Sequence, residues 1–210
     1  MIFENVNIQP YNTFGIAAKS SKFADFSSLE ELKTLFHELN DSKPIMILGG
    51  GSNVLFTKDF DGTILKNNLK GFEICSSDEN SVLIKSGAGE NWHSFVLHTI
   101  ENGFGGLENL SLIPGNVGAS PMQNIGAYGR EIKDVFHSLE AFHIASGEIH
   151  TFSNAECKFG YRESVFKNEL KGQYVILNVT FKLTTQNHVL TTSYGAIDEE
   201  LTKMQISTPT

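Results

Sequence analysis

This sequence of 210 residues contains little cysteine and little arginine, and its basic residues are outnumbered by acidic ones. The two cysteines, Cys75 and Cys157, lie far apart and lack the spacing of metal ligands, so we expect two buried, unpaired thiols in a reducing compartment. Lys and Arg together number 16 against 24 Asp and Glu, which gives a net charge of −8. This balance argues against a nucleic-acid partner.

Long apolar runs are also missing. No stretch approaches the roughly 18 consecutive apolar residues of a membrane-spanning helix. The N-terminus, Met-Ile-Phe-Glu-Asn, has no basic region followed by an apolar segment, which is the pattern of a signal peptide. We therefore expect a cytoplasmic protein with no membrane partner.

Neither a metal site nor a hydrolase nucleophile is indicated. The histidines show no ligand spacing, and His93 and His98 would lie on different faces of a helix. Ser52, Ser120 and Ser164 have no adjacent base in a nucleophile-elbow motif. We expect no bound metal.

The first third of the chain predicts a small α/β lobe, residues 1–70. A capping box at Ser28–Glu31 begins a helix that we expect to end near Asn40-Asp41. Residues 45–48, Ile-Met-Ile-Leu, predict a buried strand, and after a glycine turn residues 54–56 predict another strand. With 40% hydrophobic residues, the whole chain can form one large domain or two lobes of this kind.

The remainder predicts a second lobe, residues 71–190, built mainly on strands, and a tail, residues 191–210. Alternating or apolar patterns predict strands over 81–85, 136–145, 148–152 and 175–183. An apolar stripe over 92–100 predicts a helix, which Gly103 ends in a left-handed conformation. A second capping box opens a short helix at Ser153–Glu156, and a further helix is expected over 196–204.

The predicted strand 45–48 is followed directly by Gly49-Gly50-Gly51-Ser52-Asn53. Turns that bind phosphate commonly occupy this position after a strand. This turn fails the dinucleotide fingerprint, because Val54 stands where the third glycine is required, and it lacks the Gly-Lys-Ser/Thr ending of a P-loop. It still offers a nest of backbone amides with a hydroxyl and a carboxamide, enough to bind a pyrophosphate. A tight turn without a ligand is the alternative.

The most unusual stretch is 110–129, Leu-Ser-Leu-Ile-Pro-Gly-Asn-Val-Gly-Ala-Ser-Pro-Met-Gln-Asn-Ile-Gly-Ala-Tyr-Gly. Glycines allow positive φ and close backbone approach, while Ser120, Gln123 and Asn124 add uncharged hydrogen-bonding groups. Such a loop suits a large, flat, polar cofactor. A long structural loop is the alternative, although long loops in compact domains are usually functional or disordered.

Arginine is used only at Arg130 and Arg162. A chain that otherwise uses lysine is expected to need the guanidinium fork at Arg162, to bind a carboxylate or a developing oxyanion. An ion pair with Glu163 is the alternative, and the geometry of adjacent residues disfavours it.

In its motifs the chain resembles the MurB family of UDP-N-acetylenolpyruvoylglucosamine reductases. The resemblance covers nearly the whole chain in family order. It is carried by Asn-Thr-Phe-Gly-Ile at 12–16, Ile-Leu-Gly-Gly-Gly-Ser-Asn-Val-Leu-Phe at 47–56, Gly-Ala-Gly-Glu-Asn-Trp-His at 87–93, Gly-Leu-Glu-Asn-Leu-Ser-Leu-Ile-Pro-Gly at 106–115, Gln-Asn-Ile-Gly-Ala-Tyr-Gly at 123–129 and Cys-Lys-Phe-Gly-Tyr-Arg-Glu-Ser-Val-Phe-Lys at 157–167.

The resemblance implies an α+β, two-lobed FAD-binding fold of the vanillyl-alcohol oxidase (PCMH) type, which is not a Rossmann fold. It implies tightly bound FAD, with NADPH as hydride donor. The cofactor-binding residues that it implies are Gly49, Gly50, Gly51, Ser52, Asn53, Ile113, Pro114, Gly115, Gly118, Ala119, Ser120, Gln123, Asn124, Ile125, Gly126, Ala127 and Gly129.

The resemblance also implies a small-molecule substrate, a UDP-linked enolpyruvyl sugar that is reduced for peptidoglycan synthesis, and a monomeric enzyme. Arg162 matches the family arginine that polarises the substrate carboxylate, and Tyr128 and Tyr194 match substrate-binding positions. The family's Gly-Ser-Phe-Phe-Lys-Asn-Pro segment, whose serine protonates the intermediate, is not in this sequence, nor is the late glutamate that assists it. We therefore expect these 210 residues to be an incomplete reductase with little or no turnover.

Two alternatives stay open on the sequence alone. One is a module that binds FAD or a nucleotide without catalysis. The other is a different flavin enzyme of the same fold, in which Arg162 serves another acid substrate.

Overall fold

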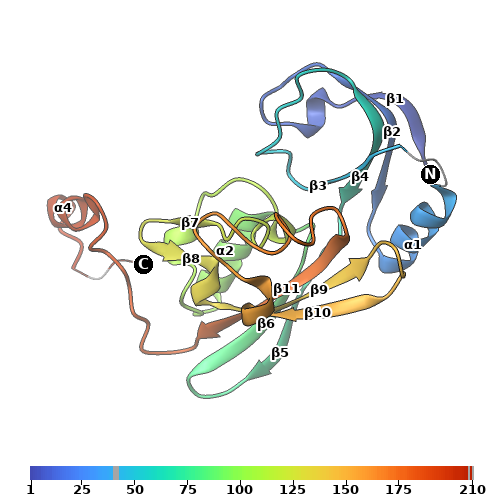
Figure 1. Cartoon of the computed structure of the whole chain (residues 1–210). Coiled ribbons are helices and arrows are strands. Elements are labelled where there is room, and N and C mark those ends of the chain that lie inside the picture. The colour runs from blue at the N-terminus through green and yellow to red at the C-terminus, as the bar shows by residue number, and fades with distance from the viewer. Residues whose placement is uncertain (40–42, 208, 210) are drawn as a thin grey trace.

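The computed structural model describes residues 1–39, 43–207 and 209. Most of the strands in these residues belong to two main sheets (Figure 1). The first sheet has the strand order β1-β2-β4-β3, and the second has the order β10-β9-β11-β6-β5. The mixture of parallel and antiparallel strands with separate helices is the α+β arrangement that we expected.

The first sheet contains β1 (Phe3–Asn7), β2 (Lys19–Phe26), β3 (Ile45–Leu48) and β4 (Phe60–Asn67). Both β2 and β3 run parallel to β4, whereas β1 pairs with β2 in the antiparallel direction. The helix α1 (Leu29–Glu38) makes the crossover between the parallel strands β2 and β3.

The capping of α1 differs by one residue from the expected box. The Ser28 hydroxyl accepts from the Glu31 amide at 3.2 Å, as expected, but the Glu31 carboxylate accepts from the Ser27 amide at 2.7 Å instead of the Ser28 amide. The first bond satisfies the Glu31 amide, which the first turn leaves without a helical partner, and the second ties the residue before the N-cap to the helix. The helix ends at Glu38, and the expected end near Asn40-Asp41 lies outside the described residues.

The second sheet confirms the four expected strands and adds one. The expected strands are β6 (Ser81–Gly87), β9 (Phe136–His143), β10 (Ile149–Ser153) and β11 (Tyr174–Thr184). The added strand is β5 (Phe72–Ser77), an exposed edge strand that carries Cys75. The prediction of two buried thiols is therefore wrong for Cys75, which is exposed, and correct for Cys157.

The remaining elements are short. They are α2 (Trp92–Glu101), α3 (Asn154–Cys157), α4 (Ile197–Lys203), the strand pair β7 (Gly126–Ala127) and β8 (Arg130–Glu131), and the 3-10 turns η1 (Gln9–Tyr11), η2 (Glu108–Leu110), η3 (Val117–Ala119) and η4 (Ile132–Asp134). Gly103 has φ +74° after α2, and the Ser153–Glu156 capping box is present at α3, both as expected. The strand expected at 54–56 is wrong, because those residues form a loop before β4.

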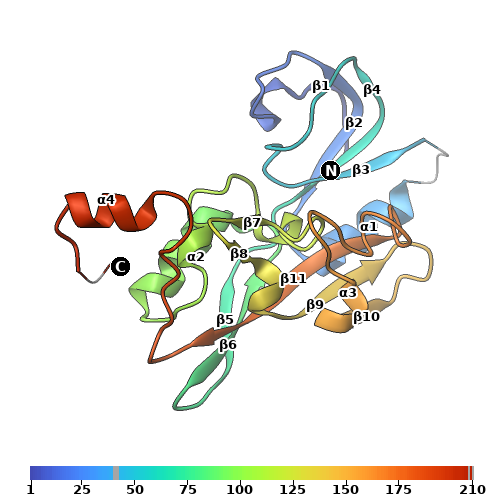
Figure 2. The same cartoon turned by 60° about the vertical axis from the view of Figure 1, so that its left-hand side comes forward.

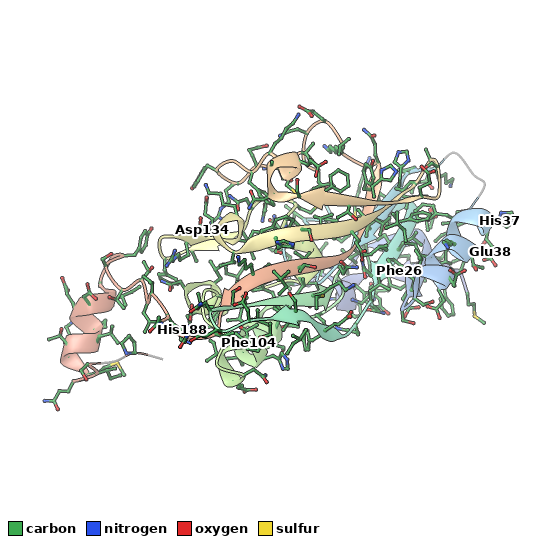
Figure 3. All side chains as sticks on the ribbon, turned by 90° about the horizontal axis from the view of Figure 1, so that it is seen from below. Phe26, His37, Glu38, Phe104, Asp134 and His188 are labelled. Carbon is green, nitrogen blue, oxygen red and sulfur yellow. The ribbon has the colours of Figure 1, made fainter. Side chains whose placement is uncertain are left out.

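The two sheets are joined by a buried apolar layer around α1. Leu32 and Leu35 of α1 belong to one cluster with Phe26 of the first sheet and with Phe142 and Leu177 of the second. Figure 3 shows Phe26 lying inward, while His37 and Glu38 lie at the outer end of α1. This shared core fixes the first sheet on one end of the second, and thereby fixes the loops that each sheet carries.

The tail leaves the second sheet at β11 and ends in α4, which stands apart from both sheets (Figure 2). Thr184 is held to Gly105 by backbone hydrogen bonds, and its hydroxyl lies 2.6 Å from His188 Nδ1, beside Phe104 (Figure 3). No residue of α4 is buried.

Candidate cofactor site

The glycine turn 49–53 follows β3 directly, as expected, and its shape requires glycine at one position. Gly51 has φ +65°, and a Cβ there would overlap the carbonyl of Tyr11. The Gly51 carbonyl in turn accepts from the Thr13 amide at 3.1 Å. The turn is therefore pressed against residues 11–13, and a side chain at Gly51 has no space.

The second glycine-rich loop, 110–129, meets this turn backbone to backbone. A Cβ on Gly50 would lie 3.0 Å from the Gly115 Cα, and a Cβ on Gly115 would lie 3.0 Å from the Ser52 hydroxyl. Asn53 donates a hydrogen bond to the Gln123 side chain at 3.3 Å. Two glycine-rich stretches that are distant in the sequence thus form one site.

Between them lies a cleft of about 450 Å³. Its lining includes eight of the expected cofactor residues, which are Ser52, Asn53, Ile113, Pro114, Ala119, Ser120, Gln123 and Ile125. It also includes four residues that we did not expect, which are Trp92, Asn116, Met122 and Lys167. Trp92 and Lys167 both belong to recognised motifs, 87–93 and 157–167, so membership of those motifs was the available signal.

The remaining expected cofactor residues do not line the cleft. They are Gly49, Gly50, Gly51, Gly115, Gly118, Asn124, Gly126, Ala127 and Gly129. Several of them set the shape of the loops: Gly118 packs on Ala88, and buried Asn124 donates to the Gly160 carbonyl at 3.0 Å while accepting from the Lys133 amide at 3.1 Å.

Ser120 shows that the cleft fits a polar ligand. Its side chain is 1% exposed, it lines the cleft, and its hydroxyl has no hydrogen-bond partner. A buried hydroxyl without a partner costs about 1–3 kcal/mol. A cofactor with carbonyl, amide or phosphate oxygens would satisfy this hydroxyl, and the apolar walls at Trp92 and Ile113 suit a flat ring system.

Positive charge lies behind the glycine turn. The Lys66 ammonium lies 3.4 Å from the Gly49 carbonyl and donates to it. Burial, followed by the nearby Lys70 ammonium, lowers the pKa of Lys66, whereas Asp25 raises it. Exposed amides in a glycine turn backed by a lysine favour a phosphate group.

Arg162 lies at the tip of a tight turn that joins Gly160 and Glu163, and it has φ +55°. Its guanidinium donates to the Gly126 carbonyl at 2.5 Å and to the Asn124 carbonyl at 3.4 Å. The ion pair with Glu163 is not formed, because Glu163 instead pairs with Lys167 at 3.4 Å. Arg162 is thus fixed to the loop that begins at Gln123, next to the cleft lining.

A carboxylate lies near this arginine. This carboxylate is Glu131. Its hydrogen bond with Lys133 lowers its pKa, and the charge of Arg162 lowers that pKa to a smaller extent. Glu131 pairs with Lys133 at 2.5 Å and therefore stays ionised. Lys133 compensates part of its charge, so an anionic ligand could still approach Arg162.

Tyr128 and Tyr194 come together, although neither lines the cleft. Their rings meet edge to face with centroids 6.1 Å apart, and both are about half exposed. The Asn109 amide donates to the Tyr128 carbonyl at 3.1 Å and to the Thr191 carbonyl at 2.8 Å. The tail that carries Tyr194 is therefore tied to the hairpin formed by β7 and β8.

Within residues 1–39, 43–207 and 209, three or more His, Cys, Asp or Glu side chains nowhere gather in a group that could hold a metal ion. The helices in the same part of the chain all fall short of the length and apolar content that crossing a membrane requires.

Comparison with known proteins gives consistent results. The chain is 56% identical over 209 residues to a UDP-N-acetylenolpyruvoylglucosamine reductase of Flavobacterium johnsoniae, a match that covers 100% of this chain and 62% of the relative. The chain thus spans about three-fifths of the length of this relative. It is 24% identical to the crystal structure of MurB from Thermus caldophilus, with a TM-score of 0.68, covering 100% of this chain and 72% of that one.

The fold also occurs in a solved structure whose sequence is more distant. The structure of p-cresol methylhydroxylase matches 85% of this chain and 38% of its own length, with a TM-score of 0.56 and 15% identity. These likenesses confirm the PCMH-type fold that we expected. Residues 22–153, more than half of the chain, match the FAD binding domain family. The chain therefore belongs to the FAD binding domain family.

Proposed function

We propose that the chain holds FAD in the cleft between residues 49–53 and 110–125. The observation that carries this assignment is the unpartnered Ser120 hydroxyl in a cleft formed by two glycine-rich loops, within a member of an FAD-binding family. The amides of the glycine turn, backed by Lys66, would hold the pyrophosphate. Trp92, Ile113 and Pro114 would contact the ring system. The other expected cofactor residues would act through the shape of the loops.

We further propose that the chain is the FAD-binding portion of a UDP-N-acetylenolpyruvoylglucosamine reductase. Support comes from 56% identity to a protein of that name. Bound FAD would supply hydride chemistry, with NADPH as the donor. Arg162 would bind the substrate carboxylate and stabilise negative charge that develops on it, while Tyr128 and Tyr194 would contact the UDP-sugar.

The same proposal covers the organisation of the chain. Residues 1–70 and 71–190 would be the two lobes that bind FAD, and residues 191–210 would begin a linker to the substrate-binding part. Synthesis of a nucleotide-linked precursor favours a cytoplasmic location, and we propose a monomer.

The first test is the visible absorption spectrum of the purified chain after addition of FAD and desalting. A retained flavin band at one equivalent per chain is expected. A folded but colourless protein would contradict the cofactor assignment.

The second test adds the UDP-linked enolpyruvyl sugar to the flavin-loaded chain. A shifted flavin spectrum supports the reductase assignment, and NADPH oxidation then measures turnover. We expect turnover far below that of a full-length relative, because the chain spans about three-fifths of the length of that relative. A bound flavin whose absorption spectrum does not change on addition of the sugar would instead indicate a binding module without this catalytic function.

A further inference from the structure

The first half of the glycine-rich loop 110–129 is held in place by one short segment, residues 88–93, which we call the brace. The Gly118 amide donates to Ala88 and the Val117 amide to Glu90, both at 2.9 Å. The Asn116 side chain donates to the Gly89 carbonyl at 3.1 Å. The brace therefore runs beside the loop and exchanges hydrogen bonds with it.

The start of α2 continues this pairing through Trp92. Its backbone amide donates to the Gly115 carbonyl at 3.0 Å. Its indole N–H donates to the Leu110 carbonyl at 2.7 Å. Both ends of the 110–115 segment are thus fixed by one residue, and the Leu112 amide between them has a different partner.

His93 supplies that partner. The Leu112 amide donates to His93 Nδ1 at 3.2 Å, and the Ser111 hydroxyl lies 3.1 Å from the same nitrogen. Because a backbone amide can only donate, Nδ1 is the acceptor in this hydrogen bond, which assigns the ring N–H to Nε2.

The peptide that His93 holds is strained. Leu112 has φ +62°, a region that bulky residues rarely adopt, and its side chain is 77% exposed. A conformation of this kind is unfavourable for a bulky residue, so the surrounding structure must stabilise it. Exposure of the leucine side chain means that apolar packing supplies little of that stabilisation.

The strain has a consequence for the cleft, because Ile113 and Pro114 follow Leu112 directly and both line it. We propose that His93 is a positioning residue for the cofactor site: its Nδ1 holds Leu112 in the left-handed conformation that directs Ile113 and Pro114 into the cleft. This inference rests on the proposed binding of FAD.

The test compares His93→Leu, which removes the acceptor, with His93→Asn, whose side-chain oxygen can take the place of Nδ1. FAD affinity is measured by flavin fluorescence, and thermal unfolding of the cofactor-free protein checks folding. We expect His93→Leu to weaken FAD binding about tenfold, the effect of one lost hydrogen bond at a strained site. His93→Asn should restore affinity to within about twofold of the unsubstituted chain.

A second substitution tests the strain itself. Asparagine adopts positive φ far more readily than leucine does, so Leu112→Asn should make the loop less dependent on His93. The double variant His93→Leu/Leu112→Asn should therefore bind FAD more tightly than His93→Leu alone. It also supplies a testable protein if His93→Leu does not fold.

Three outcomes would overturn the proposal: unchanged affinity in His93→Leu, a His93→Asn variant as weak as His93→Leu, or no gain from Leu112→Asn in the double variant. If the unsubstituted chain binds no FAD, the proposed function fails separately. Hydrogen exchange at the Leu112 amide then decides the role of His93, since exchange should be slow in the unsubstituted chain and in His93→Asn and fast in His93→Leu.

Discussion

Gly50 and Gly115 face each other with no side chain between them, and a Cβ on Gly50 would lie 3.0 Å from the Gly115 Cα. Gly50 belongs to the first sheet's loop and Gly115 belongs to the second's. At this contact the loops carried by the two sheets meet backbone to backbone. The width of the cleft depends on the absence of side chains at this contact.

This contact predicts unequal effects of alanine at neighbouring glycines. Gly50→Ala would push Gly115 and Asn116 away, whereas a Cβ on Gly49 meets Asn116 at an ordinary 3.5 Å. We expect Gly50→Ala to weaken FAD binding about tenfold, as overpacking costs about 1–3 kcal/mol. Gly49→Ala is the matched control and should stay close to the unsubstituted chain in an FAD titration. Equal effects of the two substitutions would contradict this account.

Ser120 predicts opposite effects on stability and binding. Removing a buried hydroxyl that has no partner should leave the cofactor-free protein equally stable or more stable. The same Ser120→Ala change should weaken FAD binding by about 1 kcal/mol, because the cofactor loses a donor. Urea unfolding and FAD titration measure the two effects.

Ser164 provides the control for that experiment. It is equally buried, but its hydroxyl donates to the Met122 carbonyl at 2.7 Å and accepts from the Phe166 amide at 3.2 Å. Ser164→Ala should therefore lower the free energy of unfolding by about 1–2 kcal/mol. A Ser120→Ala protein destabilised to the same extent would mean that the Ser120 hydroxyl already has a partner without FAD.

Much of the fold follows from local sequence signals. Alternation over 175–183 and the capping box at Ser153–Glu156 each act within a few residues, and both gave the observed elements. The apolar run at 54–56 failed because Phe56 is buried in the core from a loop, so burial there does not require a strand. Exposed β5 was missed because an edge strand has no buried face to pattern its residues.

The loops of the site could be predicted from the sequence, whereas the other residues that line the cleft could not. Clusters of glycine indicate positive φ and close approach of the backbone, and they identify 49–53 and 110–129 from the sequence alone. Trp92 and Lys167 line the cleft only because helix α2 and the turn after Arg162 are packed beside the loops. Such placements depend on tertiary packing, and spacing along the chain does not reveal them.

The two cysteines should differ in reactivity. Cys75 is exposed, whereas burial raises the pKa of the Cys157 thiol to about 12. Because the thiolate is the reactive form, a disulfide reagent at pH 8 should modify one thiol in the native protein and two after unfolding. Cys75→Ser should leave no rapidly reacting thiol. Rapid native labelling of that variant would contradict the burial of Cys157.

The same pKa predicts a loss of stability at alkaline pH. The folded state holds the Cys157 proton up to about pH 12, whereas the ordinary thiol value is 9.0. The contribution of this group to folding is therefore complete below pH 9 and is lost as pH rises toward 12. Cys157→Ala should flatten that decline when urea unfolding is followed across this range.

Arg162 should separate substrate binding from cofactor binding. Its guanidinium spans the carbonyls of Gly126 and Asn124 and can still present donors to a carboxylate, a geometry that a single ammonium cannot reproduce. Arg162→Lys keeps the charge, so we expect FAD affinity within about twofold and binding of the UDP-linked enolpyruvyl sugar weakened at least about tenfold. Arg130→Lys is the matched control, because the Arg130 guanidinium donates to the Val189 carbonyl at 3.3 Å, away from the cleft lining. If Arg162→Lys weakens FAD and sugar binding equally, the arginine supports the loop and does not recognise the substrate.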